Sequence, residues 1–404
     1  MTLPNTTDST YFKHGFGLKG EIKEDLVQDY HSALVEKLKA EGHTYRVGDL
    51  TIRLAQEFGF CYGVDKAVDY AYETRLKFPD RKVYLTSQII HNPSVNHRLE
   101  EMGVHFLSKE GNASFDSVTP DDVVLLPAFG VPVKDLEVLK AKGCILVDTT
   151  CGSVVHVWKR VERYAEDGYT AIVHGKFNHE ETRATCSRAS QFPGGKYLVL
   201  FNLEEAREAC DYILKGGSKE KFLQKFGQVA ASGFDPDKDL ERVGCANQTT
   251  MLSSESLEVA KLFSETMAKK YGPENLEQHF RSFDTICSAT QERQDAVIAL
   301  LKEGVDVMIV VGGYNSSNTN HLCEIAVLKT AAFHIEDAAC LLSRDEIRHK
   351  PVGTKELQTT RHWDKPGPLK IGITSGASTP DRVMGEVIEK LVAILTDSCI
   401  ERKA

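Results

Sequence analysis

The stretch CILVDTTCGSVV, residues 144–155, places an apolar, strand-like segment directly before Cys151 and a helical pattern after it. The same order of strand, cysteine and helix recurs at Cys61 and Cys287. The apolar runs are 50–58, 144–150 and 283–286, and the helical patterns are 64–78, 154–167 and 290–303. Such a turn puts the sulfur near a helix N-terminus, which favours the metal-binding thiolate. Three such turns, brought together, would hold three irons of an iron–sulfur cubane and leave the fourth iron open.

Apolar runs alternate with helical patterns along the rest of the chain. The further runs are 82–90, 122–129, 169–175, 197–202, 243–248, 305–312, 330–336 and 369–374. This alternation is typical of parallel α/β sheets, and continuous apolar runs indicate strands that are buried on both faces. Because ligands bind at the carboxyl ends of such strands, we expect three α/β lobes in a pseudo-threefold arrangement around a central iron–sulfur cluster.

The expected domain division follows the cysteine turns. Residues 1–48, with a charged helix around 23–40, are predicted to be an N-terminal packing or capping extension. The three lobes are predicted at 49–143, 144–282 and 283–404.

Composition indicates an enzyme rather than a nucleic-acid-binding or membrane protein. The chain of 404 residues is 41% apolar and carries a formal net charge of −9, whereas phosphate-backbone binding needs clustered Lys and Arg. The apolar runs are too short to span a membrane. Ten cysteines without a C-x-x-C pair, and no recognisable targeting signal, predict reduced thiols and a cytoplasmic location.

Two strand ends carry hydroxyl- and amide-rich turns, at 312–321 and 374–380. Backbone N–H groups at the start of the following helix favour an anion, so the turns predict a phosphate or diphosphate. An ordinary polar turn with a helix cap is an equally good explanation of the first turn. His91 and His179, which also follow strands, could bond phosphate oxygens, although a satisfied core or surface histidine is the commoner role.

Glu181 lies two residues beyond His179. Burial in a cleft beside a cluster would raise the pKa of its carboxyl group and allow it to deliver protons. An acidic first helical turn explains the same residue, and Glu180 suits that role too. Thr249 could likewise be either a strand-end cap or part of a proton network.

Eight ordered motifs resemble those of the 4-hydroxy-3-methylbut-2-enyl diphosphate reductase family. They are GFCYGV (59–64), IHNP (90–93), DTTC (148–151), HEET (179–182), NQTT (247–250), TICSAT (285–290), NSSN (315–318) and SGAS (375–378). The resemblance covers about residues 49 to 390. The N-terminal extension and the PAFG turn at 127–130 are similar to the longer branch of plants and cyanobacteria.

The resemblance implies an iron–sulfur oxidoreductase of the non-mevalonate isoprenoid pathway. It would reduce an allylic alcohol diphosphate to isopentenyl and dimethylallyl diphosphate with two electrons and two protons. One [4Fe-4S] cluster with an open iron would be supported by three cysteine ligands, and ferredoxin or flavodoxin is the implied electron donor. The implied site residues are Cys61, Cys151 and Cys287 as ligands, Glu181 and Thr249 for proton delivery, and Thr249, His91, His179, Ser316, Ser317, Asn318 and Ser378 for the substrate.

The chain departs from the family pattern at two places. Phe129 stands where many members have histidine, which removes one expected diphosphate contact, and Gly152-Ser153 follows Cys151 where proline is usual. The sequence is also compatible with two other functions. An iron–sulfur hydro-lyase would eliminate water without consuming electrons, and a non-catalytic iron–sulfur sensor would bind a diphosphate without turnover.

Overall fold

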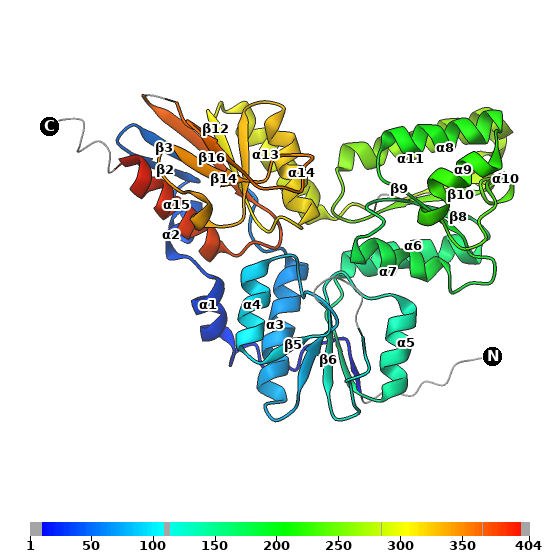
Figure 1. The fold of residues 1–404 in the computed structure, drawn as a ribbon, viewed down its shortest axis with the longest axis horizontal. Coiled ribbons are helices and arrows are strands. Elements are labelled where there is room, and N and C mark those ends of the chain that lie inside the picture. Colours follow the sequence, from blue (N-terminus) through cyan, green and yellow to red (C-terminus); the bar gives the residue numbers. More distant parts are fainter. Residues whose placement is uncertain (1–9, 109–113, 284, 366, 397–404) are drawn as a thin grey trace. The chain divides into compact units, whose positions relative to one another are not determined.

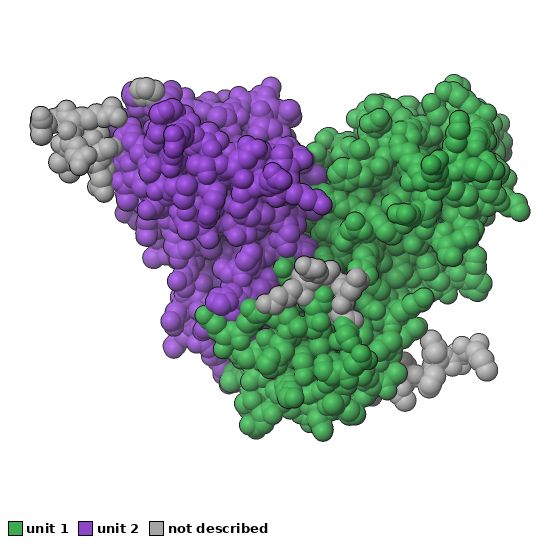
Figure 2. Space-filling view, viewed as in Figure 1, with its two compact units in different colours: residues 1–15, 74–89, 100–287 green, residues 16–73, 90–99, 288–404 purple. Residues whose placement is uncertain are grey.

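The computed structural model describes residues 10–108, 114–283, 285–365 and 367–396. The chain forms two compact units, coloured separately in Figure 2. Unit 1 comprises residues 1–15, 74–89 and 100–287, and unit 2 comprises residues 16–73, 90–99 and 288–404. Cys151 and Cys287 therefore belong to unit 1, whereas Cys61 belongs to unit 2.

Unit 1 contains two parallel sheets (Figure 1). The first has the order β1 (Tyr11–Phe12), β7 (Ile145–Asp148), β6 (Val123–Leu126), β4 (Val83–Leu85) and β5 (Val104–Phe106). The second has the order β11 (Phe280–Ser282), β10 (Val243–Asn247), β8 (Thr170–His174) and β9 (Tyr197–Leu200). The helices of this unit are α5 (Val133–Lys142), α6 (Gly152–Glu166), α7 (Glu180–Ala189), α8 (Leu203–Lys215), α9 (Lys219–Phe226), α10 (Pro236–Asp239), α11 (Ser253–Tyr271) and α12 (Leu276–His279).

Unit 2 is built on one mostly parallel sheet. Its order is β13 (Ala331–Ile335), β12 (Val307–Val311), β16 (Leu369–Ser375), β3 (Leu50–Leu54) and the antiparallel edge strand β2 (Thr44–Val47). A separate hairpin pairs β14 (Glu346–His349) with β15 (Gln358–Arg361). The helices are α1 (Lys23–Tyr30), α2 (Ala33–Ala40), α13 (Ser288–Lys302), α14 (Ser317–Val327) and α15 (Asp381–Thr396). Two more, α3 (Tyr62–Lys77) and α4 (Pro93–Glu101), continue into unit 1.

The central strands are buried on both faces, as their continuous apolar runs predict. Along β12, Val307, Ile309 and Val311 pack in a core with residues of α2 and α15. The alternate residues Met308 and Val310 pack in another core with residues of α13 and α14. Each buried side chain of this size contributes roughly 1.5–3 kcal/mol to stability. Helices on both sides of a parallel sheet are thus confirmed for this unit.

The strand pairings differ from the expected lobe boundaries at two places. The strand before Cys61, β3, pairs with β16, so it joins the sheet of the C-terminal segment rather than a sheet of residues 49–143. The strand before Cys151, β7, pairs with β6 and thus belongs with residues 49–143. Hydrophobic pattern identifies a buried strand but contains no information on its neighbour, which explains both differences.

The N-terminal segment does not only pack against the domains; it contributes strands to their sheets. It adds β1 to the first sheet of unit 1 and β2 to the sheet of unit 2. The expected helix at 23–40 is two helices, because the Ser32 hydroxyl accepts a hydrogen bond from Val35 N (3.3 Å) and starts α2 there.

The strand before Cys287 also differs from the prediction, since β11 spans Phe280–Ser282 rather than 283–286. Residue 284 of the expected run lies outside the described residues. Within the described part of the chain, no helix has the length and apolar character that crossing a bilayer demands.

Candidate functional site

Cys151 and Cys287 lie in the loops that precede α6 and α13. Cys151 is the N-cap residue of α6, and its N–H donates to Ala128 O (2.8 Å). The N–H of Cys287 donates to Thr249 O (3.4 Å), and its Sγ accepts a hydrogen bond from the Ser153 hydroxyl (3.5 Å). The loops of Cys151, Cys287 and Thr249 are thus joined within unit 1.

The exposure of the thiols separates these residues from the other cysteines. Of the nine described cysteines, Cys61, Cys151 and Cys287 are partly exposed and the other six are buried. Burial raises the pKa of several of the six, among them Cys186 and Cys245. These buried thiols pack as small apolar groups, while Cys399 lies outside the described residues.

Glu181 is a buried acid that Thr249 holds from two sides. The side chain, 2% exposed, accepts hydrogen bonds from Thr249 N at Oε1 (2.6 Å) and from Thr249 Oγ1 at Oε2 (2.9 Å). Burial raises the pKa of Glu181 to about 7, although both hydrogen bonds oppose the rise. The acid expected from the sequence therefore has the environment of a proton donor at neutral pH.

His179 caps the helix that carries this acid. Its Nδ1 accepts a hydrogen bond from Glu181 N (3.2 Å), so Nδ1 bears no hydrogen and the ring offers Nε2–H as its donor. His179 can thus donate a hydrogen bond to a ligand from Nε2. The Phe129 ring packs edge-on against His179, with centroids 6.3 Å apart, and so forms part of the wall beside it.

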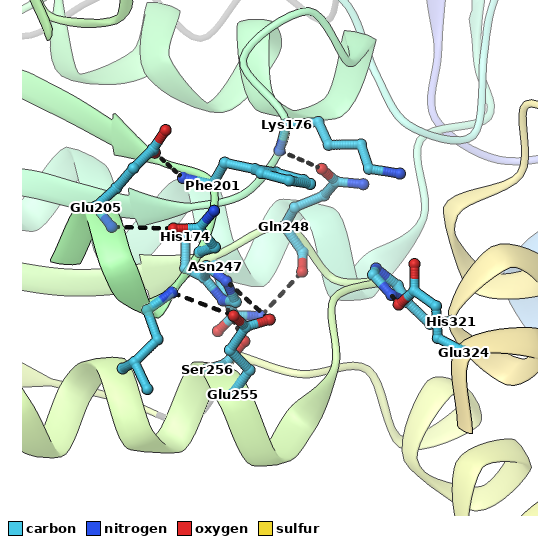
Figure 3. A network of polar contacts seen from close by, with 12 residues as sticks. His174, Lys176, Phe201, Glu205, Asn247, Gln248, Glu255, Ser256, His321 and Glu324 are labelled. Atoms are coloured by element: carbon cyan, nitrogen blue, oxygen red, sulfur yellow. Dashed lines mark hydrogen bonds and ion pairs between the residues drawn. The ribbon is translucent and has the colours of Figure 1, made fainter. Parts of the chain in front are cut away.

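Gln248 directly follows β10 and accepts a hydrogen bond from Lys176, in the loop after β8 (Figure 3). It also contacts helix α7 through Thr182. Its Oε1 accepts from Lys176 N (3.1 Å) and Thr182 Oγ1 (3.2 Å), and its Nε2 donates to Thr250 Oγ1 (2.8 Å). Because Thr182 follows Glu181 directly, this amide fixes the acid's helix relative to the strand end that carries Thr249. Gln248 therefore acts as a positioning residue at this strand end.

In unit 2, Cys61 directly precedes α3 and is hydrogen-bonded to the turn after β16. The N–H of Cys61 donates to Ala377 O (3.2 Å). Gly59 has a φ of +80°, and a Cβ at this position would lie 2.7 Å from Asp381 Oδ1. The turn before Cys61 therefore requires glycine.

The turns after β12 and β16 form one polar region. The Asn318 Oδ1 accepts from Ala377 N (3.0 Å), while its buried Nδ2 has no hydrogen-bond partner among the described residues. The Ser316 hydroxyl caps α14 by accepting from Thr319 N (3.3 Å). Asn318 is 3% exposed, so its Nδ2 is a buried donor that is available to a hydrogen-bond acceptor from outside the protein.

His91 lies beside these two turns in unit 2. The Ser378 hydroxyl donates to His91 O (3.1 Å), and Asn315 Nδ2 lies 3.5 Å from His91 Nδ1. A Cβ on Gly313 would lie 2.7 Å from His91 O, so the glycine permits this close approach.

The predicted site residues thus form one group within each unit. Unit 1 brings together two cysteines, His179, Glu181 and Thr249, and unit 2 brings together Cys61, His91, Ser378 and the Ser316–Asn318 turn. Sequence reasoning missed the contact of Ser153 with Cys287, which are 134 positions apart. A contact between residues so far apart in the sequence leaves no local sequence pattern from which it could be predicted.

The sequence is similar to a known protein family and to named enzymes. A model of the family described as LytB protein matches residues 52–392. The 4-hydroxy-3-methylbut-2-enyl diphosphate reductase of Gloeobacter violaceus is 51% identical over 387 residues, covering 94% of this chain and 92% of that protein. The reductase of the same name from Thermosynechococcus vestitus is 50% identical over 390 residues, 96% of each chain.

Two solved structures are also similar. One is (E)-4-hydroxy-3-methyl-but-2-enyl diphosphate reductase, the terminal enzyme of the non-mevalonate pathway, with a TM-score of 0.52 and 30% identity over 85% of this chain and 99% of that one. The reductase structure from Plasmodium falciparum, at 23% identity and a TM-score of 0.60, covers 84% of this chain and 87% of that one and supports the fold. The family match over most of the length, together with relatives at about half identity, shows that this chain belongs to the LytB family.

Proposed function

We propose that this protein reduces 4-hydroxy-3-methylbut-2-enyl diphosphate to isopentenyl diphosphate and dimethylallyl diphosphate, the last step of the non-mevalonate pathway. The names of its relatives support the reaction. The observation that carries the proposal is the buried carboxyl group of Glu181, which Thr249 holds and whose pKa is raised to about 7. Reductive removal of a hydroxyl group consumes protons, and this site can hold one at neutral pH.

The cysteines fit an iron–sulfur cluster as the resident cofactor. Cys61, Cys151 and Cys287 are the partly exposed thiols among the described cysteines, and each precedes a helix of fifteen or sixteen residues. We propose that they hold one [4Fe-4S] cluster with one iron free of protein ligands, at the centre of three α/β lobes. When bound, such a cluster would supply electrons to the substrate one at a time.

The reaction needs two protons and two electrons for each substrate molecule. The C–O bond of the allylic alcohol breaks, the oxygen leaves as water after taking one proton, and a C–H bond forms with the other. Glu181 would hold the proton for the leaving oxygen, because its raised pKa keeps a substantial fraction of the carboxyl protonated near pH 7.

The position of that proton follows from the hydrogen bonds of Glu181. Thr249 N–H donates to Oε1, so the carboxyl proton belongs on Oε2, which is 2.9 Å from Thr249 Oγ1. A protonated Oε2 can donate to Oγ1, and the Thr249 hydroxyl hydrogen can then point at the substrate alcohol. Thr249 would thus both orient the alcohol and relay the proton.

The diphosphate would bind at the polar turns. In unit 2 the donors are the free Nδ2 of Asn318, the hydroxyls of Ser316 and Ser317, and the first N–H groups of α14. The Ser378 hydroxyl donates to His91 O in this structure and would join them by turning away from that carbonyl. His91 and His179 would add ring N–H donors. Hydrogen bonds to charged oxygens are worth roughly 1.5–3 kcal/mol each, enough to anchor the substrate while its alcohol end reacts.

The electron donor would be a small protein, ferredoxin or flavodoxin, as the family implies. A chemical reductant can replace it in the decisive experiment. Purified protein with its cluster reconstituted is mixed anaerobically with the hydroxylated diphosphate and dithionite-reduced methyl viologen, and viologen oxidation and products are measured. We expect two electrons consumed per product molecule. Water elimination without electron consumption would identify a hydro-lyase, and binding without products would identify a sensor.

A further inference from the structure

Arg293, on α13, is a buried cation that is hydrogen-bonded to the turn before Cys61. The residue is 3% exposed. Its Nη2 donates to Gly59 O (2.7 Å), two residues before the cysteine, and its Nη1 donates to Ala289 O (2.8 Å) in the first turn of its own helix. The Gly59 N–H in turn donates to Ser375 Oγ (3.0 Å). Both peptide groups of Gly59 are thus fixed, one of them by a charged side chain.

This guanidinium forms no ion pair with a carboxylate among the described residues, although its charge acts on the Asp65 carboxyl. Its two hydrogen bonds go to neutral carbonyl groups, no carboxylate forms an ion pair with it, and its Nε is buried without a partner. Buried charges in proteins are almost always paired or bound to a ligand, because desolvating an isolated charge costs several kcal/mol. A missing negative partner close to this turn is therefore to be expected.

The field of Arg293 also reaches the helix that Cys61 begins. Asp65 lies one turn into α3, where its N–H donates to Cys61 O (2.9 Å). Arg293 is close enough for its positive charge to act on the Asp65 carboxyl. The charge thus acts at the N-terminal turn of α3, on the residue hydrogen-bonded to Cys61.

We infer that Arg293 is a positioning residue for Cys61 and that its missing counter-charge is the anionic, thiolate-ligated cluster, which rests on the proposed function. Three thiolates on a [4Fe-4S] core give a net negative charge, and one-electron reduction makes it more negative. A buried cation favours the more negative state, so Arg293 raises the reduction potential of the cluster. Through Gly59 it also holds the cysteine's turn in place.

The test compares Arg293→Gln, which removes the charge but keeps a hydrogen-bond donor, with Arg293→Lys, which keeps the charge. The control is Arg53→Met, which removes a positive charge from the same unit at a half-exposed side chain paired with Glu303 (2.6 Å). Three quantities are measured for each protein. They are iron and sulfide content after anaerobic reconstitution, the midpoint potential of the cluster, and the melting temperature of the metal-free chain.

We expect Arg293→Gln to lower the midpoint potential and to weaken cluster retention by roughly 10- to 100-fold, the usual effect of losing a group behind a metal ligand. Arg293→Lys should keep the parental potential with intermediate retention, and Arg53→Met should match the parent in both. A purely structural role would lower the melting temperature of Arg293→Gln and leave the potential unchanged, which overturns the inference. If Arg293→Gln does not fold, Arg293→Lys decides the question. A midpoint potential of the cluster in Arg293→Lys well below that of the parent protein also overturns the inference.

Failure of the proposed function gives a different pattern. Parent protein that carries the cluster but consumes no electrons with the hydroxylated diphosphate contradicts the reductase assignment, while the Arg293 comparison of potentials still decides the inference. Parent protein that takes up no iron overturns both.

Discussion

The polar strand ends of the two units differ in how their hydrogen bonds are used. In unit 1, Glu181 and Thr249 satisfy each other, and Gln248 uses both ends of its amide on neighbouring groups. In unit 2, Asn318 has one end of its amide bonded and the other buried without a described partner. The hydrogen bonds of Glu181 and Thr249 fix the position of a carboxyl proton in unit 1. The Nδ2 of Asn318 in unit 2, unpaired among the described residues, can donate to a ligand instead. We therefore propose that the same position in an α/β sheet supports chemistry in one unit and binding in the other.

Replacing a cysteine of unit 1 is the most severe test of this difference between the units. We expect Cys287→Ser to lose most of its iron and all measurable turnover, because a hydroxyl group is a poor substitute for a thiolate ligand. The control is Cys245→Ala, which alters a buried thiol of β10 in the same unit and should keep parental iron content. Visible absorption and iron analysis check both. Equal iron in both variants would remove Cys287 from the ligand set.

Glu181→Gln separates proton delivery from assembly of the site. The amide keeps the shape of the side chain but has no acidic proton, so turnover should fall by roughly 10²- to 10⁴-fold while iron content stays at the parental level. Glu180→Gln, one residue earlier in α7, is the matched control and should retain most activity. Turnover of Glu181→Gln near the parental rate would rule out this residue as the acid.

Asn318→Ala tests the binding role of unit 2. Loss of a hydrogen bond to a charged oxygen costs roughly 1.5–3 kcal/mol, which predicts a KM raised about 10- to 100-fold. Iron content should not change. Asn202→Ala, which removes the N-cap of α8 in unit 1, should lower the melting temperature and leave KM unaltered. A KM that moves equally in both variants would contradict a contact between Asn318 and the diphosphate.

The pH dependence of turnover tests whether Glu181 is the proton donor. The proton-donating form of Glu181 is present below its pKa of about 7 and is lost as the pH rises through that value. Turnover should therefore decline above about pH 7, approaching tenfold per pH unit where protonation limits the rate. A pH profile with a chemical reductant checks this. A flat profile from pH 6 to 9 would show that another group supplies the proton.

Ser153→Ala should have the smallest effect. The hydroxyl donates to Cys287 Sγ (3.5 Å), and hydrogen bonds to sulfur ligands raise cluster potentials. Its loss predicts a small fall in midpoint potential with unchanged iron content, and Ser153→Thr should restore the parental value. A potential that is the same in the parent and both variants would indicate that this contact has no electronic effect.

The sequence allowed accurate prediction of elements whose signal is local. The continuous apolar run 305–312 identified the buried strand β12, and the hydroxyl-rich turn at 312–321 was expected to lead into a helix, which is α14. Partner choice could not be predicted, since the pairing of β3 with β16 joins Leu50 to Leu369 without any local mark of it. The burial of Arg293 was missed for the same reason, because a charged helical residue ordinarily indicates a solvated face.

The cap of α14 has a consequence for selectivity. Ser316 Oγ accepts from both the N–H and the hydroxyl of Thr319, at 3.3 and 3.0 Å, so its lone pairs are occupied. Only its hydrogen remains to face outward, beside the amide hydrogens of Asn318 and the helix. The turn thus presents hydrogen-bond donors from neutral groups, namely a hydroxyl, a side-chain amide and backbone N–H groups. It should prefer anions at any pH at which the protein is folded, without depending on the protonation of a basic side chain.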